Sequence, residues 1–153
     1  MEIMRKLSEK YIEKTINSVL DQPYKDLEIL CIDDGSKDSS SEIVKSISDK
    51  DNRVKYIYKE NGGLHTAYNT AIANIDTELC VCIDSDDFMP DNAVGLILDF
   101  WKKNGSDKYA GIVGLDFDMD GNVIGDMLPD IKSVNLIGLF TGKYNIVNGD
   151  RTN

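Results

Sequence analysis

The feature of this 153-residue sequence that most limits its fold is an apolar run that stops abruptly in acid. The apolar residues 80–83 are followed by Asp84, Asp86 and Asp87, with only Ser85 among them. Such a run is typical of a buried strand that opens into a loop. Ligands of open α/β sheets bind at the carboxyl ends of strands, so this loop is a candidate ligand site. Two interpretations of it are open. The loop is either a divalent metal site with a phosphorylated ligand or a solvated acidic turn before the next helix.

Two other loops carry related signals. Residues 27–32 form a second apolar run, which Asp33 and Asp34 follow directly. A third predicted strand, over residues 54–58, is rich in tyrosine and β-branched residues and is followed by Asn61-Gly62-Gly63. The backbone amides at the start of the helix that comes next favour anions.

Helical periodicity predicts amphipathic helices that start near Ser8, near Asp38 or Ser39, near Gly63 and near Asp91. Strands that alternate with helices of about ten to fifteen residues predict an α/β fold, a mostly parallel sheet with helices on both faces. Because successive parallel strands end at the same edge of a sheet, the three loops are expected to open onto one crevice. This convergence favours a ligand site over three unrelated solvated turns.

The sequence also predicts how two of these helices begin and what the last one buries. Ser39 and Glu42 have the spacing of a capping box. Asp91 is expected to cap the fourth helix. The apolar stripe of that helix is expected to face the core, and it consists of Val94, Ile97, Leu98 and Trp101.

Beyond the fourth helix, residues 109–115 predict a further strand. Asp120-Gly121 is a hairpin turn signal before Val123-Ile124, and residues 134–140 are compatible with a short helix. Residues 116–121 also match the first half of a calcium loop, but Met127 stands where the bidentate glutamate belongs. A hairpin tip is therefore favoured over a calcium site.

Composition argues against several kinds of partner. The chain has 17 Lys+Arg against 27 Asp+Glu, and this net charge of −10 argues against nucleic acid and anionic lipid. The length suits one domain, so residues 1–153 are expected to form a single domain. No apolar run approaches the ~20 residues that span a bilayer, and the start lacks the apolar core of a secretion signal. A cytoplasmic protein without a transmembrane segment is expected.

The cysteines agree with a reducing compartment. Cys31, Cys80 and Cys82 all fall in strand-like runs and are expected to be free, buried thiols. Cys80 and Cys82 share one face of their strand, but a single C-x-C pair favours core packing over a zinc site.

Three motifs in order carry a resemblance to a known family: Ile-Asp-Asp-Gly-Ser-Lys-Asp at 32–38, Glu-Asn-Gly-Gly at 60–63 and Ile-Asp-Ser-Asp-Asp at 83–87. In this order and at these spacings they resemble the family 2 glycosyltransferases, most densely over residues 11–103. The resemblance implies a Rossmann-like GT-A nucleotide-binding sheet. It also implies metal-dependent, inverting transfer of a sugar from a nucleotide-sugar donor, usually a UDP-sugar, to a glycan or another hydroxyl acceptor.

The resemblance also implies roles for individual residues. Asp33, together with Asp34, would accept hydrogen bonds from the nucleotide base, and Asn61-Gly62-Gly63 would border the nucleotide. Asp86 would coordinate Mn²⁺ or Mg²⁺, while Asp84 would contact the ribose or the water shell of the metal. His65, at the start of the third helix, either touches the diphosphate or is an exposed helical residue.

The sequence departs from the family pattern at three places. Residues 1–7 do not match the usual first strand, whose place is taken either by residues 1–4 or by a partner subunit. Tyr68 stands where many members have arginine. No downstream acid, Asp126, Asp130 and Asp150 included, has the surroundings of a general base, so no catalytic base is named. A catalytically incomplete nucleotide-binding module or a subunit of a larger assembly, self-association included, is therefore the alternative to an enzyme.

Overall fold

The computed structural model describes the backbone of residues 2–5 and the complete residues 8–125, 131–135, 137, 138, 141 and 144. The chain divides into two compact units, Met1–Tyr109 and Ala110–Asn153. The first unit contains the larger sheet and the helices around it. Among the described residues, no helix has both the length and the apolar character needed to cross a membrane.

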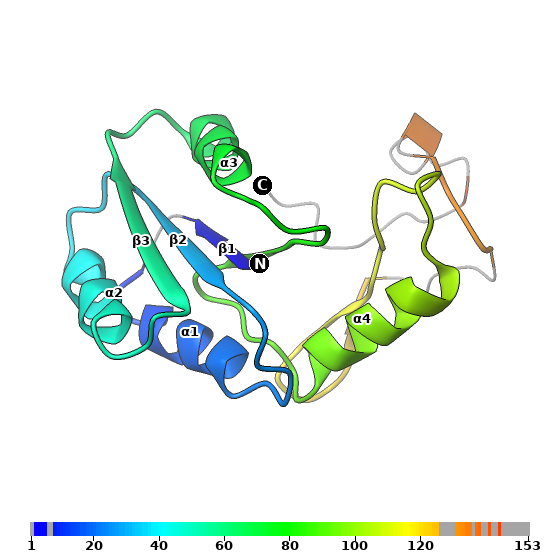
Figure 1. Ribbon diagram of the computed structural model, residues 1–153, viewed down its shortest axis with the longest axis horizontal. Helices are drawn as coiled ribbons and strands as arrows, with labels where there is room; N and C mark the ends of the chain where they lie inside the picture. Colours follow the sequence, from blue (N-terminus) through cyan, green and yellow to red (C-terminus); the bar gives the residue numbers. More distant parts are fainter. Residues whose placement is uncertain are drawn as a thin grey trace. The chain divides into compact units, whose positions relative to one another are not determined.

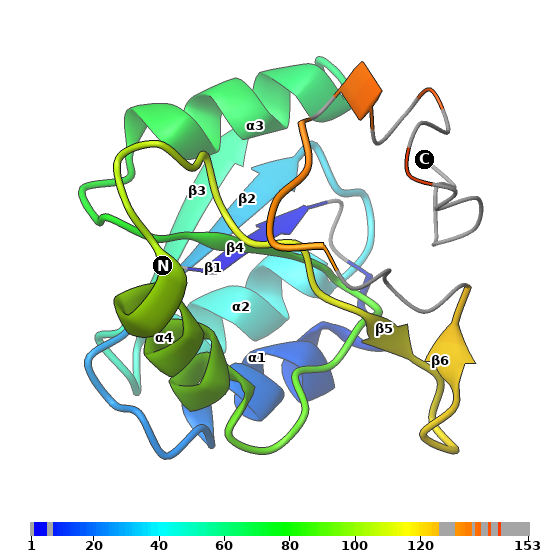
Figure 2. The same cartoon turned by 90° about the vertical axis from the view of Figure 1, so that its right-hand side faces the viewer.

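The larger sheet has four strands in the order β3-β2-β1-β4. Figure 1 labels β1, β2 and β3, and Figure 2 labels β4 as well. Their bounds are β1 Glu2–Arg5, β2 Ile29–Asp34, β3 Val54–Lys59 and β4 Val81–Asp84. Each neighbouring pair in this sheet is parallel, as the alternation of strands and helices predicted. The carboxyl ends of all four strands therefore meet at one edge.

Helices cover both faces of this sheet (Figure 2). They are α1 (Ile12–Leu20) and α2 (Ser40–Ser48) on one face, and α3 (Leu64–Ala73) on the other. Ile29 and Cys31 of β2 belong to the core under α1 and α2, whereas Leu30 and Ile32 belong to the core under α3. A strand that is buried on both faces reads as a continuous apolar run, which explains the pattern at 27–32. The predicted α/β fold with helices on both faces is confirmed.

β1 is a central strand of the sheet, between β2 and β4. Met4 is in register with both Cys31 of β2 and Ile83 of β4. Of the two ways in which the missing first-strand motif could be replaced, the chain thus uses its own residues, Glu2–Arg5.

The predicted capping box at the start of α2 is wrong. Ser39 is the residue before the helix, but its side chain makes no capping hydrogen bond. Instead the Asp38 carboxylate accepts hydrogen bonds from the Ser40 amide at 3.1 Å and from the Ser40 hydroxyl at 2.6 Å. The Ser39 amide donates to Glu9 at 3.0 Å, so a residue just before α1 completes this cap. An aspartate that bonds the chain two residues on is a local alternative to the capping box.

α4 (Ala93–Asn104) begins one residue later than predicted, after Asn92, which has a left-handed φ of 58°. Of its predicted core stripe only Val94 is buried, and the other three members are half-buried. The neighbouring Leu96 and Phe100 are 63% and 54% exposed. The prediction that this stripe is core is therefore right for one residue, because little of the first unit covers α4.

The second unit contains a two-stranded antiparallel hairpin, β5 (Asp116–Phe117) and β6 (Val123–Ile124). Gly121 in its turn has φ +83°, so the predicted Asp120-Gly121 hairpin is confirmed. Residues 109–115 form no strand, because an apolar run needs a pairing partner to become one, and residues 109–114 are exposed. The predicted helix at 134–140 lies partly outside the described residues, and Asp126, Met127, Asp130 and Asp150 lie wholly outside them.

The cysteines differ from expectation in one respect. Cys31 is buried, and this burial raises the pKa of its thiol to about 12. Cys80 and Cys82 are exposed, because β4 is the last strand of the sheet and lacks cover there. The prediction that this pair packs in the core is therefore wrong.

Candidate functional site

The predicted acidic residues come together at the carboxyl edge of the sheet. Asp34 is in register with Lys59 of β3, and Asp84 is in register with Arg5 of β1. Met4 of β1 is in register with both Cys31 and Ile83. Asp84 is therefore level with the residue before Asp33, one position further from the end of β2. Neighbouring strands are about 4.8 Å apart, so the backbones of β2 and β4 are separated by about 10 Å at this edge.

Asp34 binds the loop that follows β3. Its carboxylate pairs with the Lys59 ammonium, and it accepts hydrogen bonds of 3.0 Å each from the amides of Gly62 and Gly63. The Asn61 side chain donates a 3.0 Å hydrogen bond to the Asp34 carbonyl. Burial alone would raise the pKa of Asp34, but the bonds from Lys59 and the two amides outweigh it and lower that pKa. Asp34 is thus the anion that the amides before α3 bind.

Two glycines permit this contact between β2 and the loop. Gly63 has φ +84°, a conformation that residues with a side chain rarely adopt. Gly35, directly after Asp34, has φ +77°, and a Cβ there would come within 3.1 Å of the Asn61 backbone nitrogen. The loop and the end of β2 therefore approach as closely as their backbones allow.

Asp33 lies on the opposite face from Asp34, as adjacent strand residues do. It is 1% exposed, on the side of α1 and α2. Its Oδ1 accepts a 2.7 Å hydrogen bond from the Ser36 amide, and its Oδ2 accepts one of 2.6 Å from the Tyr56 hydroxyl. Burial and the Asp33 contact raise the pKa of Tyr56. The two carboxylates thus have different partners: Asp33 bonds Ser36 and Tyr56, whereas Asp34 bonds the loop after β3.

The acidic loop after β4 has a tight turn, in which the Asp87 amide donates to the Asp84 carbonyl at 3.0 Å. Asp84 is half-buried, Ser85 is buried and Asp86 is exposed. No group of three or more His, Cys, Asp or Glu that could hold a metal is present in the described part of the chain. Hard carboxylate oxygens fit Mn²⁺ or Mg²⁺ provided that diphosphate and water supply the remaining ligands. The donor set suits a metal that arrives with a phosphorylated ligand.

Three polar side chains of α1 and of the residues after it hold this acidic loop, and they were not predicted from the sequence. The Thr15 hydroxyl donates to the Ser85 carbonyl at 2.8 Å. The contacts further along the loop come from Ser18 and Gln22. Their signal in the sequence is a set of polar residues at i, i+3 and i+7 that interrupts the apolar face of a helix.

Two other residues singled out in the sequence are also described. His65 is exposed in the first turn of α3, and Asp118 accepts hydrogen bonds from the amides of Asp120 and Asn122 at the hairpin tip. Asp118 thus closes the turn, in line with the reading as a hairpin tip.

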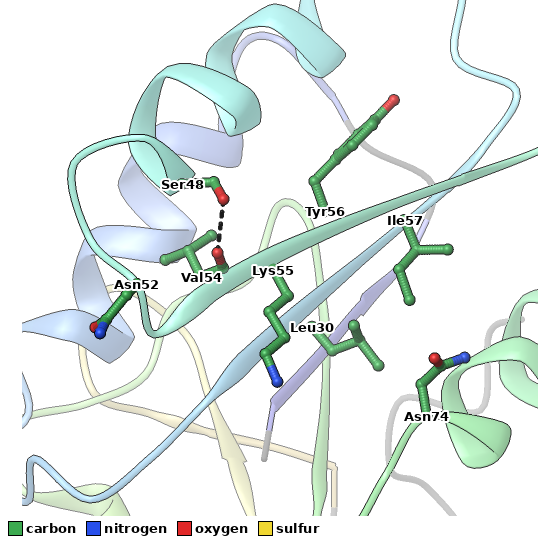
Figure 3. A pocket seen from close by; sticks show the side chains of 8 residues that line it. All are labelled: Leu30, Ser48, Asn52, Val54, Lys55, Tyr56, Ile57 and Asn74. Carbon is green, nitrogen blue, oxygen red and sulfur yellow. Dashed lines mark hydrogen bonds between the residues drawn. The ribbon is translucent and has the colours of Figure 1, made fainter.

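A hollow of about 500 Å³ lies along β3, the first strand in the sheet order (Figure 3). Its wall is formed by Leu30, Ser48, Asn52, Val54, Lys55, Tyr56, Ile57 and Asn74. It contains none of the acidic residues predicted for the site. Val54, at its lining, is the first residue of β3, whereas the acidic loops follow the other end of the strands. The hollow is therefore distinct from the candidate site.

The chain matches the sequence model of Glycosyl transferase family 2 over residues 4–148. It is 41% identical over 86 residues to glycosyltransferase GlyA of Streptococcus pneumoniae, covering 56% of this chain and 12% of that protein. It is 35% identical over 115 residues to chondroitin synthase of Escherichia coli, covering 75% of this chain and 17% of that protein.

A solved structure gives the same fold. The crystal structure of Staphylococcus aureus TarS 1-349 in complex with UDP superposes with a TM-score of 0.61 at 28% identity. The match covers 69% of this chain and 32% of that one. The chain therefore spans less than a third of the length of each of these three proteins.

Proposed function

The chain belongs to glycosyl transferase family 2 and has the GT-A fold, and from this premise we propose that it is the donor-binding part of a glycosyltransferase. Residues 1–153 form a single, partial domain that binds a nucleotide-sugar, in the first place a UDP-sugar. The reaction is the metal-dependent, inverting transfer of the sugar to a glycan or another hydroxyl acceptor. Cys31, Cys80 and Cys82 form no disulfide, which supports a reducing compartment, the cytoplasm.

The observation that carries this proposal is the meeting of three ligand-like loops at the carboxyl edge of one parallel sheet, where open α/β sheets bind ligands. The TarS structure supports UDP as the nucleotide, since its fold matches and its identity to this chain is 28%. The loops supply hydrogen-bond acceptors, which suit a base, and a carboxylate pair, which suits a diphosphate that carries a divalent cation.

Asp33 is proposed to accept a hydrogen bond from the base. Each carboxylate oxygen has two acceptor positions, and Ser36 and Tyr56 take one on each, so acceptor capacity remains for an N–H such as that of uracil. Because Asp33 is 1% exposed, the base has to displace part of the cover over this carboxylate to reach it. Asp34, held to residues 61–63, forms the adjoining wall of the nucleotide site. The Asn61-Gly62-Gly63 segment thus contributes its shape, while its Gly62 and Gly63 amides bind Asp34.

Asp84 and Asp86 are proposed to face the ribose and the diphosphate. Asp86, the exposed acid at the tip of the loop, holds Mn²⁺ or Mg²⁺, and Asp84 contacts the ribose or water on the metal. A bound divalent cation stabilises the negative charge that develops on the diphosphate as the glycosidic bond breaks. The role of the chain is to hold these carboxylates where that charge appears.

The test is a thermal shift with UDP and Mn²⁺. We expect the melting temperature to rise in the wild type and to stay unchanged in Asp86→Asn. The matched control is Asp120→Asn, which removes an equally negative, exposed carboxylate from the hairpin of the other unit and should keep the full rise. No rise with any nucleoside diphosphate in the wild type would refute the proposal.

A second candidate function is a nucleotide-diphosphate-binding subunit that transfers nothing by itself. The observation that favours it is the apolar surface of α4, where Leu96 and Phe100 are exposed. Exposed apolar patches of this kind mark surfaces that another chain covers. Transfer of sugar from a UDP-sugar by the purified chain, measured as UDP release with an added acceptor, distinguishes the enzyme from the subunit.

A further inference from the structure

We propose that Thr15, Ser18 and Gln22 are positioning residues, which hold the acidic loop so that Asp84 and Asp86 face the metal and the diphosphate. We call these three side chains the α1 ladder. The inference rests on the proposed function, and it assigns a task to residues that touch neither the nucleotide nor the metal.

The first step of the ladder acts next to the proposed metal ligand. The Thr15 hydroxyl donates a 2.8 Å hydrogen bond to the carbonyl of Ser85, and both residues are buried. That carbonyl belongs to the peptide bond between Ser85 and Asp86. Because the Asp86 side chain is exposed, its direction depends largely on this peptide plane. A rotation of the peptide would move the carboxylate away from the edge of the sheet.

The second step fixes the far end of the loop. The Met89 amide donates a 3.0 Å hydrogen bond to the hydroxyl of Ser18. The same hydroxyl donates to the Thr15 carbonyl at 2.7 Å, so it joins the loop to the helix backbone. The loop is thus held on both sides of Asp86.

The third step ties the loop to the start of α4. The Gln22 side-chain amide donates to the Ser18 carbonyl at 3.0 Å and to the Pro90 carbonyl at 2.8 Å, and its oxygen accepts from the Val94 amide at 3.2 Å. Gln22 is 2% exposed, so the loss of any of these partners would leave a buried polar group unsatisfied. These three hydrogen bonds together fix the Gln22 side chain between α1, the acidic loop and α4.

The placement of these residues argues for a role beyond core packing. Thr15 lies on the same buried helix face as Ile12, Ile16 and Val19. Burying a polar group in such a stripe costs free energy unless it is hydrogen-bonded, and an apolar residue would avoid that cost. Each of the three side chains also bonds a backbone carbonyl of its own helix region, Thr15 that of Tyr11 at 3.2 Å. Their remaining contacts all go to the segment that carries the acidic residues or to its exit. Supports of this kind keep a binding group within the narrow range of positions that metal coordination requires.

The experiment measures UDP affinity by calorimetry with and without Mn²⁺ in three variants. Thr15→Val removes the hydroxyl at nearly constant volume, and Thr15→Ser keeps it. Ser48→Ala is the matched control, since the Ser48 hydroxyl donates a 2.7 Å hydrogen bond to the Val54 carbonyl, between α2 and β3 and away from the loop. Amide hydrogen exchange at Met89 and Val94 is followed in parallel without ligand, with Ser18→Ala as a milder variant.

We expect Thr15→Val to raise the Kd for UDP with Mn²⁺ about fivefold, as the loss of one hydrogen bond of about 1 kcal/mol predicts, and to leave metal-free binding unchanged. Thr15→Ser should restore affinity, and Ser48→Ala should bind as the wild type does. In Ser18→Ala the Met89 amide should exchange faster.

The outcomes separate this inference from the proposed function. If the wild type binds UDP with Mn²⁺ but Thr15→Val binds equally well, or Ser48→Ala weakens binding as much, the positioning role is overturned while the function stands. Unchanged exchange at Met89 in Ser18→Ala would also overturn it. A wild type that binds no nucleoside diphosphate overturns both.

Discussion

The hydroxyl of Tyr56 donates a 2.6 Å hydrogen bond to Oδ2 of Asp33, joining β3 to β2 at the edge where the acidic loops meet. Asp33 is 1% exposed, so its carboxylate depends on protein donors for solvation. When one partner of a buried hydrogen bond is removed, the charged group that remains is left unsatisfied. This contact therefore links the stability of the sheet edge to the proposed base site.

Tyr56→Phe is predicted to lower the free energy of unfolding by about 2 kcal/mol, because the buried Asp33 carboxylate loses a donor. Urea unfolding measures this change. Tyr58→Phe, on the same strand but 59% exposed, is the matched control and should change stability little. Equal losses in the two variants would contradict the importance of the Asp33 contact.

The free energy of unfolding is predicted to fall at acidic pH as the Asp34 carboxylate becomes protonated. The pKa of Asp34 is lowered in the folded state, so its contribution is fully present above the ordinary value of 3.8 and is lost as pH falls through the folded pKa. Asp34→Asn should therefore be less stable than the wild type by about 2 kcal/mol at pH 7, and the difference should shrink towards pH 3. A difference that stays constant over this range, measured by urea unfolding, would refute the account.

Gly63→Ala is predicted to destabilise the chain by about 2 kcal/mol, because φ +84° at the start of α3 suits glycine alone. The amide of residue 63 would also move away from Asp34. Gly111→Ala is the control, since a Cβ there meets nothing within 4 Å. Thermal melting of both variants should show a loss only for Gly63→Ala, and a similar loss at Gly111 would argue against strain at Gly63.

Self-association through α4 is predicted, because Leu96 and Phe100 are exposed on this one helix. The double substitution Leu96→Glu with Phe100→Glu should give a monomer with an unchanged melting temperature. Met119→Glu, at a residue that is 79% exposed in the other unit, should leave association as it is. Sedimentation velocity measures the mass, and a monomeric wild type would exclude this interface.

The sheet could be predicted from the sequence because β2 is buried on both faces and therefore reads as a continuous apolar run. The acidic ends of β2 and β4 could be assigned to one edge, because successive parallel strands end at the same edge of a sheet. β1 could be predicted only as one of two alternatives, because four residues in a short, mixed segment carry too little pattern, and it is the register with β2 and β4 that makes them a strand.

The partners of the acidic residues could not be predicted, since they depend on strand register and loop closure. Nothing local to Asp34 indicates that Lys59 stands level with it on β3. Asp33 and Asp34 adjoin in sequence, yet strand alternation sends them to opposite faces, so their different protein partners could not be predicted from the sequence. The α1 ladder was missed for a related reason, because its contacts join residues about 70 positions apart in sequence.

The bond between Asp34 and the amides of Gly62 and Gly63 has a thermodynamic consequence for binding. Residues 61–63 are ordered by a carboxylate of the chain itself, so their conformational entropy is lost during folding, before any ligand arrives. A nucleotide that binds against this wall has no loop to order, and more of its contact energy is retained as affinity. On this side of the proposed site a nucleotide would meet a preorganised surface, and its association should need no slow rearrangement of the loop.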